Sequence, residues 1–132
     1  MNRLSKRIGI VHLLSVFTLI SAPTVAFAHA HLASSSPAKD SVVHSAPTDV
    51  TLHFSEELEP SMCKLDVKNF KTGEVVSQGA IATNGEDKSS LKIALKSLGN
   101  EKADYEVSWK AVSKDSHKMP GKYKFTFDPK AK

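Results

Sequence analysis

The stretch Asp104-Tyr105-Glu106-Val107-Ser108-Trp109-Lys110-Ala111 decides the fold class, because polar and apolar residues alternate through it without a break. Alternation with a period of two is typical of a β-strand that buries one face and exposes the other. The face toward the core consists of Tyr105, Val107, Trp109 and Ala111. This stretch therefore predicts one long strand.

Shorter segments of the same kind recur along the chain, separated by Pro, Gly, Asn and Asp residues that favour turns. Further strands are expected at 32–36, 42–43, 50–54, 63–67, 75–76, 80–83, 91–95 and 123–127. Residues 114–121 are expected to form a loop, and no segment after residue 28 has a helical period. About seven short strands with regular turn signals favour an all-β fold, a β-sandwich of the immunoglobulin type.

Residues 1–28 have the layout of a secretory signal peptide. The layout comprises basic residues Arg3, Lys6 and Arg7, an apolar run at 8–20, and the small-x-small motif Ala26-Phe27-Ala28. We expect cleavage after Ala28, which makes His29 the first residue and leaves one domain at 29–132. The similar motif Ala28-His29-Ala30 leaves open a second cut that would expose His31 instead.

The charge of the mature chain argues against two classes of partner. Three of the 18 Lys and Arg residues and none of the 14 Asp and Glu residues lie in 1–28, which leaves 15 basic against 14 acidic residues, a net charge of +1. This balance gives no support for a nucleic-acid or anionic-membrane partner. No later segment approaches the ~20 apolar residues of a membrane anchor, so we expect a soluble monomer.

The single cysteine, Cys63, cannot form an internal disulfide, so the fold must depend on its core. Cys63 has the same strand parity as Leu65 and Val67, which indicates a thiol buried as a small apolar group. The alternative is a soft Cu(I) ligand acting together with Met62. Adjacent strand residues face opposite sides, which argues against that pair.

Two features of the sequence indicate a metal site. An N-terminal His29 offers a metal both its free amine and its ring nitrogen. Asp115 and His117 are two residues apart, so in an extended backbone a carboxylate and an imidazole point to the same side. The alternative for this pair is a solvated loop in which Asp115 caps its own turn. His53, at an outward strand position, is interpreted as a surface histidine.

Three motifs together resemble the CopC family of periplasmic copper-binding proteins. They are His29-Ala30-His31-Leu32-Ala33-Ser34-Ser35-Ser36-Pro37, Leu52-His53-Phe54-Ser55-Glu56, and Tyr105-x-Val107-x-Trp109-x-x-Val112-Ser113-x-Asp115-x-His117-x-x-x-Gly121. The resemblance covers residues 29–128 and is strongest to small bacterial members whose mature chain starts His-Ala-His-Leu. It implies a Greek-key β-barrel or sandwich in a Gram-negative periplasm that holds copper near one end.

The resemblance also implies a ligand set for one Cu(II) ion per chain. His29 would supply its amine and ring nitrogen, and Asp115 and His117 would complete a set that suits the tetragonal N,O preference of Cu(II). Glu56 matches a family glutamate that orients a histidine ring. His31 stays open, because it could add a ligand or capture Cu(II) through the amine, two amides and its own ring.

The function that the resemblance implies is a copper carrier or buffer without enzymatic activity, with a CopD-like inner-membrane copper transporter as its partner. Some members have a methionine-rich loop for Cu(I), which should fall between Lys68 and Ala82. This region contains no methionine, so we expect a Cu(II)-only protein.

Two other functions compete with this interpretation. A copper-brace enzyme that oxidises polysaccharides also uses an N-terminal histidine, but Asp115 would block the position that such enzymes leave open for oxygen. The second is an immunoglobulin-like interaction module without a metal. The sequence contains no Gly-x-Ser-x-Gly elbow, no Gly-rich phosphate loop and no zinc spacing.

Overall fold

In the computed structural model of the chain, residues 31–130 are described, and the predicted signal peptide, its cleavage site and His29 lie outside them. The described residues form eight strands and one 3-10 turn. They are β1 (Leu32–Ser36), β2 (Val42–Val43), β3 (Asp49–Phe54), η1 (Pro60–Met62), β4 (Lys64–Asn69), β5 (Ser77–Asn84), β6 (Asp87–Leu95), β7 (Ala103–Val112) and β8 (Lys118–Phe127). Within 31–130 there is no helix that could span a membrane.

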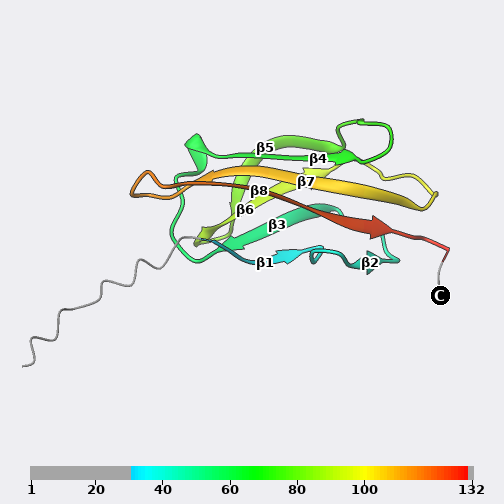
Figure 1. Cartoon of the computed structure of the whole chain (residues 1–132), viewed down its shortest axis with the longest axis horizontal. Helices are drawn as coiled ribbons and strands as arrows, with labels where there is room; N and C mark the ends of the chain where they lie inside the picture. The colour runs from blue at the N-terminus through cyan, green and yellow to red at the C-terminus, as the bar shows by residue number, and fades with distance from the viewer. Residues whose placement is uncertain (1–30, 131–132) are drawn as a thin grey trace, which may run out of the picture.

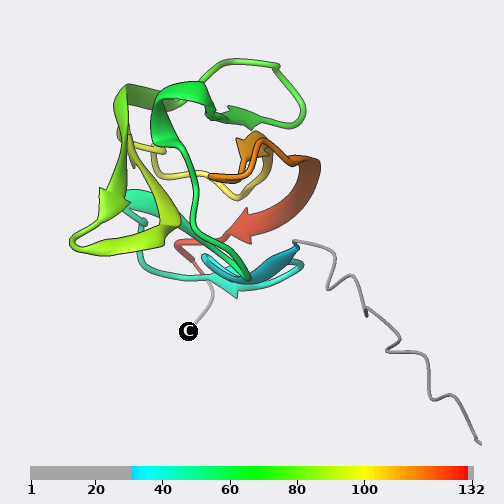
Figure 2. The ribbon, with the colours of Figure 1, turned by 90° about the vertical axis from the view of Figure 1, so that its left-hand side faces the viewer.

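The strands form two four-stranded sheets, one in the order β1-β3-β6-β5 and the other in the order β2-β8-β7-β4. Paired strands are antiparallel except β2, which runs parallel to β8. Figure 1 shows the strands along the long axis, and the end view of Figure 2 shows them around a common interior. The predicted all-β sandwich is confirmed.

The alternating residues of both sheets fill this interior. The inward residues of β3, β6, β7 and β8 are buried as the sequence predicts, namely Val50, Leu52, Phe54, Leu91, Ile93, Leu95, Tyr105, Val107, Ala111, Tyr123, Phe125 and Phe127. Trp109 packs between the two layers. The centroid of its ring lies 6.3 Å from that of Phe54 on β3 and 6.0 Å from that of Tyr123 on β8. Burial of this apolar surface is the main force that holds the sheets together.

The loop predicted at 114–121 is confirmed for residues 114–117 but is too long, because β8 already begins at Lys118. Proline and glycine at positions 120 and 121 suggest a loop, but the sheet accommodates both. Pro120 pairs with Lys110 on β7, while β2 reaches only Thr126 and Phe127 on the other side of β8. Ser113 N donates to His117 O, which makes Lys110 and Pro120 a non-hydrogen-bonded pair, so the nitrogen of Pro120 points away from β7. On that side no strand of residues 31–130 pairs with Pro120, and the sheet loses no hydrogen bond there.

The prediction for 75–83 needs a smaller correction. β5 begins at Ser77, and Val75 forms only an isolated bridge with Lys68. β4 and β5 belong to different sheets, so residues 70–76 carry the chain from one sheet to the other. Before it enters β5 the chain turns back along the end of β4, where Asn69 N donates to Glu74 O at 2.9 Å and Val76 N donates to Val67 O at 2.8 Å.

Candidate metal centre

Asp115 and His117 lie on the loop between β7 and β8, at the left end of the molecule in Figure 1. The Nδ1 atom of His117 is 3.6 Å from Oδ2 of Asp115. Both side chains are about two-thirds exposed. The structure therefore brings the predicted pair together and leaves both groups accessible from solvent.

The reason that the pair meets differs from the predicted one. The loop is a tight turn and not an extended segment, because Ser116 has a φ of 74°, in the left-handed region. The turn is closed by two backbone hydrogen bonds, from Ser116 N to Ser113 O at 2.8 Å and from Ser113 N to His117 O at 2.9 Å. The turn, and not strand parity, places the carboxylate beside the imidazole.

Ser113 is a residue of this site that the sequence interpretation did not single out. Its side chain is buried, and its hydroxyl donates a hydrogen bond to Oδ1 of Asp115 and accepts one from the His117 N–H at 3.0 Å. The hydrogen bond from Ser113, followed by those from His117, lowers the pKa of the Asp115 carboxyl. The available signal is the spacing, since Ser113 precedes Asp115 by the same two residues that separate Asp115 from His117.

The chain entering β1 lies next to the bridging segment, residues 55–59. The Ser55 N–H donates to His31 O at 3.0 Å, and the His31 N–H donates to Oγ of Ser55 at 3.0 Å. These two bonds continue the β1–β3 pairing, in which Leu32 is opposite Phe54. His31 is thereby fixed through its backbone to the first residue of the bridging segment.

The other end of the bridging segment holds the β7–β8 loop. Lys114 N donates to Glu57 O at 2.9 Å, and the Lys114 ammonium lies 3.3 Å from the Glu57 carboxylate. Leu58 forms a β-bridge with Ser113, and Glu59 N donates to Val112 O at 2.9 Å. The start of β1 and the Asp115–His117 loop are therefore tied to the same end of the sandwich.

Glu56 lies within the bridging segment and is half-buried. Its carboxylate makes no hydrogen bond or ion pair with any residue in 31–130. Over the same range no three His, Cys, Asp or Glu side chains are close enough to hold a metal ion. Within residues 31–130, Asp115 and His117 are therefore a pair of neighbouring groups and not part of a cluster of three.

Two other histidines have ordinary partners. Nδ1 of His53 is 2.9 Å from Oδ2 of Asp87, and the His53 side chain is 36% exposed. Nδ1 of His44 lies 2.9 Å from Asp128 O. Both contacts agree with surface histidines.

Cys63 and Met62, the alternative Cu(I) pair, differ in their surroundings. Cys63 is buried and Met62 is 57% exposed, so the two neighbours face different surroundings. Burial raises the pKa of the Cys63 thiol more than the hydrogen bond from the Val112 N–H lowers it. Met119 is a buried residue of β8 and not the loop residue that the sequence suggests.

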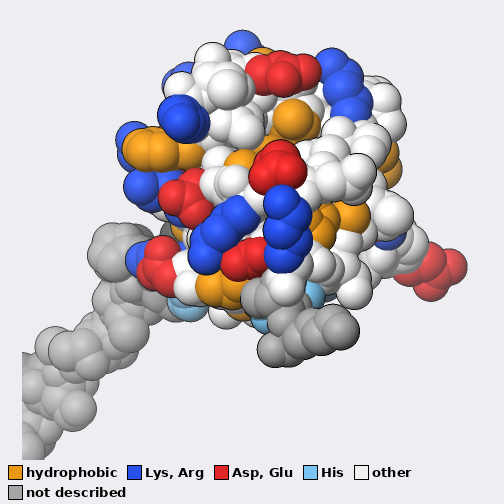
Figure 3. All heavy atoms as spheres, turned by 90° about the vertical axis from the view of Figure 1, so that its right-hand side faces the viewer, with side chains coloured by type: hydrophobic (Ala, Val, Ile, Leu, Met, Phe, Trp, Pro, Cys, Tyr) orange, Lys and Arg blue, Asp and Glu red, His pale blue; other side chains and the backbone are white. Residues whose placement is uncertain are grey.

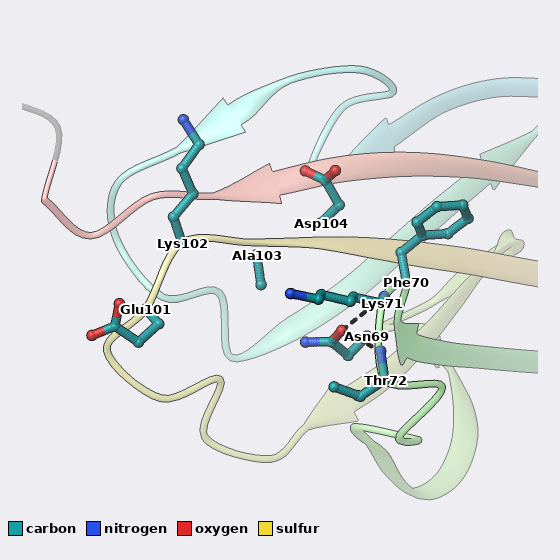
Figure 4. A pocket seen from close by; sticks show the side chains of 8 residues that line it. All are labelled: Asn69, Phe70, Lys71, Thr72, Glu101, Lys102, Ala103 and Asp104. Atoms are coloured by element: carbon teal, nitrogen blue, oxygen red, sulfur yellow. Dashed lines mark hydrogen bonds between the residues drawn. The ribbon is translucent and has the colours of Figure 1, made fainter.

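A hollow of about 390 Å³ lies at the opposite end of the molecule (Figure 4). Its walls come from the loop after β4 and the chain entering β7, namely Asn69, Phe70, Lys71, Thr72, Glu101, Lys102, Ala103 and Asp104. Lys102 pairs with Asp128 at 3.0 Å, and charges of both signs are interspersed over this face (Figure 3). The hollow contains none of the predicted site residues.

Comparisons with known proteins show which family the sequence and the sandwich resemble. A family model described as the CopC domain matches residues 32–128. Protein YobA of Escherichia coli K12 is 33% identical over 109 residues, which cover 83% of this chain and 86% of YobA. The crystal structure of CopC from Methylosinus trichosporium OB3b has a TM-score of 0.68 at 27% identity and covers 79% of this chain and 98% of that one. PcoC, a methionine-rich copper resistance protein from Escherichia coli, has a TM-score of 0.63 at 34% identity, covering 76% and 100%.

Proposed function

The chain belongs to the CopC domain family, and from this membership we propose that it is a periplasmic copper-binding protein that carries or buffers copper for copper resistance. The observation that carries the proposal is the Asp115–His117 pair. The two groups lie 3.6 Å apart, exposed, on a loop held in place by hydrogen bonds to the buried Ser113. A carboxylate beside an imidazole suits Cu(II).

In the proposed site, His29 completes the ligand set with its terminal amine and its ring nitrogen. His29 is two residues before His31, and two residues span at most ~7 Å. The bridging segment fixes His31 to the same end of the sandwich as the β7–β8 loop. One Cu(II) ion per chain would then be held by His29, Asp115 and His117.

Glu56 has a supporting role in this proposal. It lies between Ser55, which pairs with His31, and Glu57, which accepts the Lys114 N–H. A half-buried carboxylate in this position can accept a hydrogen bond from a ligand histidine ring and fix its orientation. Capture of Cu(II) through the amine, two amides and the ring of His31 is left out of the proposal, because the His31 amide N–H is already donated to Ser55.

The proposal extends to a Cu(II)-only monomer that exchanges copper with a CopD-like inner-membrane transporter. Residues 68–82 contain no methionine. In the described chain Met119 and Cys63 are buried, so neither offers its sulfur to a metal from solvent. Transfer of copper between Cu(I) and Cu(II) sites within one molecule is therefore not part of the proposal.

The test is a Cu(II) titration against a competing chelator with two forms of the mature protein. One form starts at His29, and the other has a single extra residue before it. The extra residue removes the amine–imidazole chelate and leaves Asp115, His117 and the sandwich as they are. Loss of several orders of magnitude in affinity supports the proposal, and equal affinity overturns the ligand set.

A further inference from the structure

Ser113 combines burial with contacts to both loop groups of the proposed site. Only 2% of its surface is exposed, whereas Asp115 and His117 are about two-thirds exposed. Its hydroxyl donates to the Asp115 carboxylate and accepts the His117 N–H at 3.0 Å. A hydroxyl can donate one hydrogen bond and accept others, so this one group can serve both neighbours at once.

The backbone of Ser113 is held as firmly as its side chain. Its N–H donates to His117 O at 2.9 Å, and its C=O accepts the Ser116 N–H at 2.8 Å. On the other side, Ser113 forms a β-bridge with Leu58 of the bridging segment. These contacts fix the position of the Ser113 hydroxyl relative to the exposed residues of the loop.

We propose that Ser113 is a positioning residue for copper, which holds the Asp115 carboxylate and the His117 backbone in the arrangement that the metal meets. This inference rests on the proposed function. Without the hydroxyl, Asp115 and the turn would have more conformations, and the metal would have to order them on binding.

The test compares Ser113→Ala with Ser113→Thr, which keeps the hydroxyl. Ser90→Ala is the matched control, because Ser90 is fully buried and its hydroxyl also makes two hydrogen bonds, to Asp87 O and from Asn84 N, both 2.7 Å. Thermal unfolding of each variant first defines a temperature at which all are folded. Cu(II) affinity is then measured by chelator competition, and the electron paramagnetic resonance spectrum is recorded at full loading.

We expect Ser113→Ala to weaken Cu(II) binding about 10- to 100-fold, the usual effect of losing a group that orients a metal ligand. Its spectrum should differ from that of the wild type, while Ser113→Thr and Ser90→Ala should keep the wild-type affinity and spectrum. Wild-type behaviour of Ser113→Ala overturns the inference. An equal loss in Ser113→Thr or in Ser90→Ala also overturns it.

A separate variant distinguishes failure of this inference from failure of the proposed function. Replacement of both Asp115 and His117 by alanine should abolish the wild-type copper spectrum. If that double variant binds Cu(II) as the wild type does, the site lies elsewhere and the proposed ligand set fails. If the wild type itself binds no Cu(II), the proposed function fails. If the double variant loses copper while Ser113→Ala keeps it, only the role of Ser113 is refuted.

Discussion

At the scale of single residues, Cys63 shows how burial controls the chemistry of a side chain. Its thiol donates to Glu59 O at 3.3 Å and accepts the Val112 N–H at 3.2 Å, and only 8% of the residue is exposed. Burial raises the pKa of Cys63, and the charge of Glu59 raises it further. The thiolate, which is the reactive form, is therefore scarce at neutral pH.

We expect Cys63 to resist alkylation by iodoacetamide in the folded protein at neutral pH and to react fully in urea, as measured by mass spectrometry. A Cys63→Ala/Met62→Cys variant is the control, because position 62 is 57% exposed and its thiol should be labelled in the folded state. Equal labelling rates for Cys63 and Cys at position 62 in the folded proteins would contradict the burial argument.

His31 offers a second test at this scale. Its amide N–H and C=O are both bonded to Ser55, so a Cu(II) chelate through the His31 amide would have to break the first of these bonds. We expect His31→Ala to bind Cu(II) with unchanged affinity in chelator competition, whereas His117→Ala should bind far more weakly. An equal loss in both variants would show that His31 is a ligand.

The candidate site could be predicted only in part from the residues. Asp115 and His117 could be identified, because metal ligands are recognised by side-chain type and spacing. The role of Ser113 could not, although its spacing from Asp115 is visible, because that role depends on a turn with Ser116 in the left-handed region and on the burial of Ser113. Neither feature follows from the local pattern of polar and apolar residues.

At the scale of elements, the β7–β8 hairpin carries the Asp115–His117 loop and depends on the close packing of Trp109 against Gly121. Trp109 is opposite Gly121, and a Cβ added to Gly121 would lie 2.3 Å from the indole ring. The indole thus lies over the glycine, and its ring centroid is 6.3 Å from that of Phe54 in the other sheet. A glycine that suggests a loop in the sequence is here a requirement of the strand pair.

We expect Gly121→Ala to destabilise the protein by about 1–3 kcal/mol, because the methyl group must displace the packed indole. Urea denaturation measures the change. Trp109→Phe removes the indole atoms nearest to Gly121, so the double variant should lose less stability than the sum of the two single variants. Additive losses would show that the two residues do not compete for space.

At the scale of the whole molecule, alternation identifies the strands but not their partners. The buried faces of β3, β6 and β7, and of β8 from Tyr123 onward, could be predicted, because inward and outward residues follow a period of two. The pairing of β1 with β3 and the parallel contact of β2 with β8 could not. These contacts depend on which surfaces remain uncovered once the two layers have formed, which no local pattern contains.

One charge cluster spans three strands of the second sheet and makes stability depend on pH. The Glu106 carboxylate on β7 lies 3.2 Å from the Lys68 ammonium on β4 and 3.7 Å from that of Lys122 on β8. The hydrogen bond from Lys68, followed by the charges of the nearby lysines, lowers the pKa of Glu106 in the folded protein. Folding therefore favours the ionised carboxylate.

The resulting stabilisation should be complete above the pKa of glutamate in the unfolded chain, about 4.3, and should be lost as the pH falls through the lower pKa of the folded state. We expect Glu106→Gln to lower the urea midpoint near neutral pH and to approach the wild-type midpoint in acid. Glu101→Gln removes an exposed ion pair with Lys130 and should change little at either pH. A constant difference between wild type and Glu106→Gln across this range would mean that the ionised carboxylate does not stabilise the sheet.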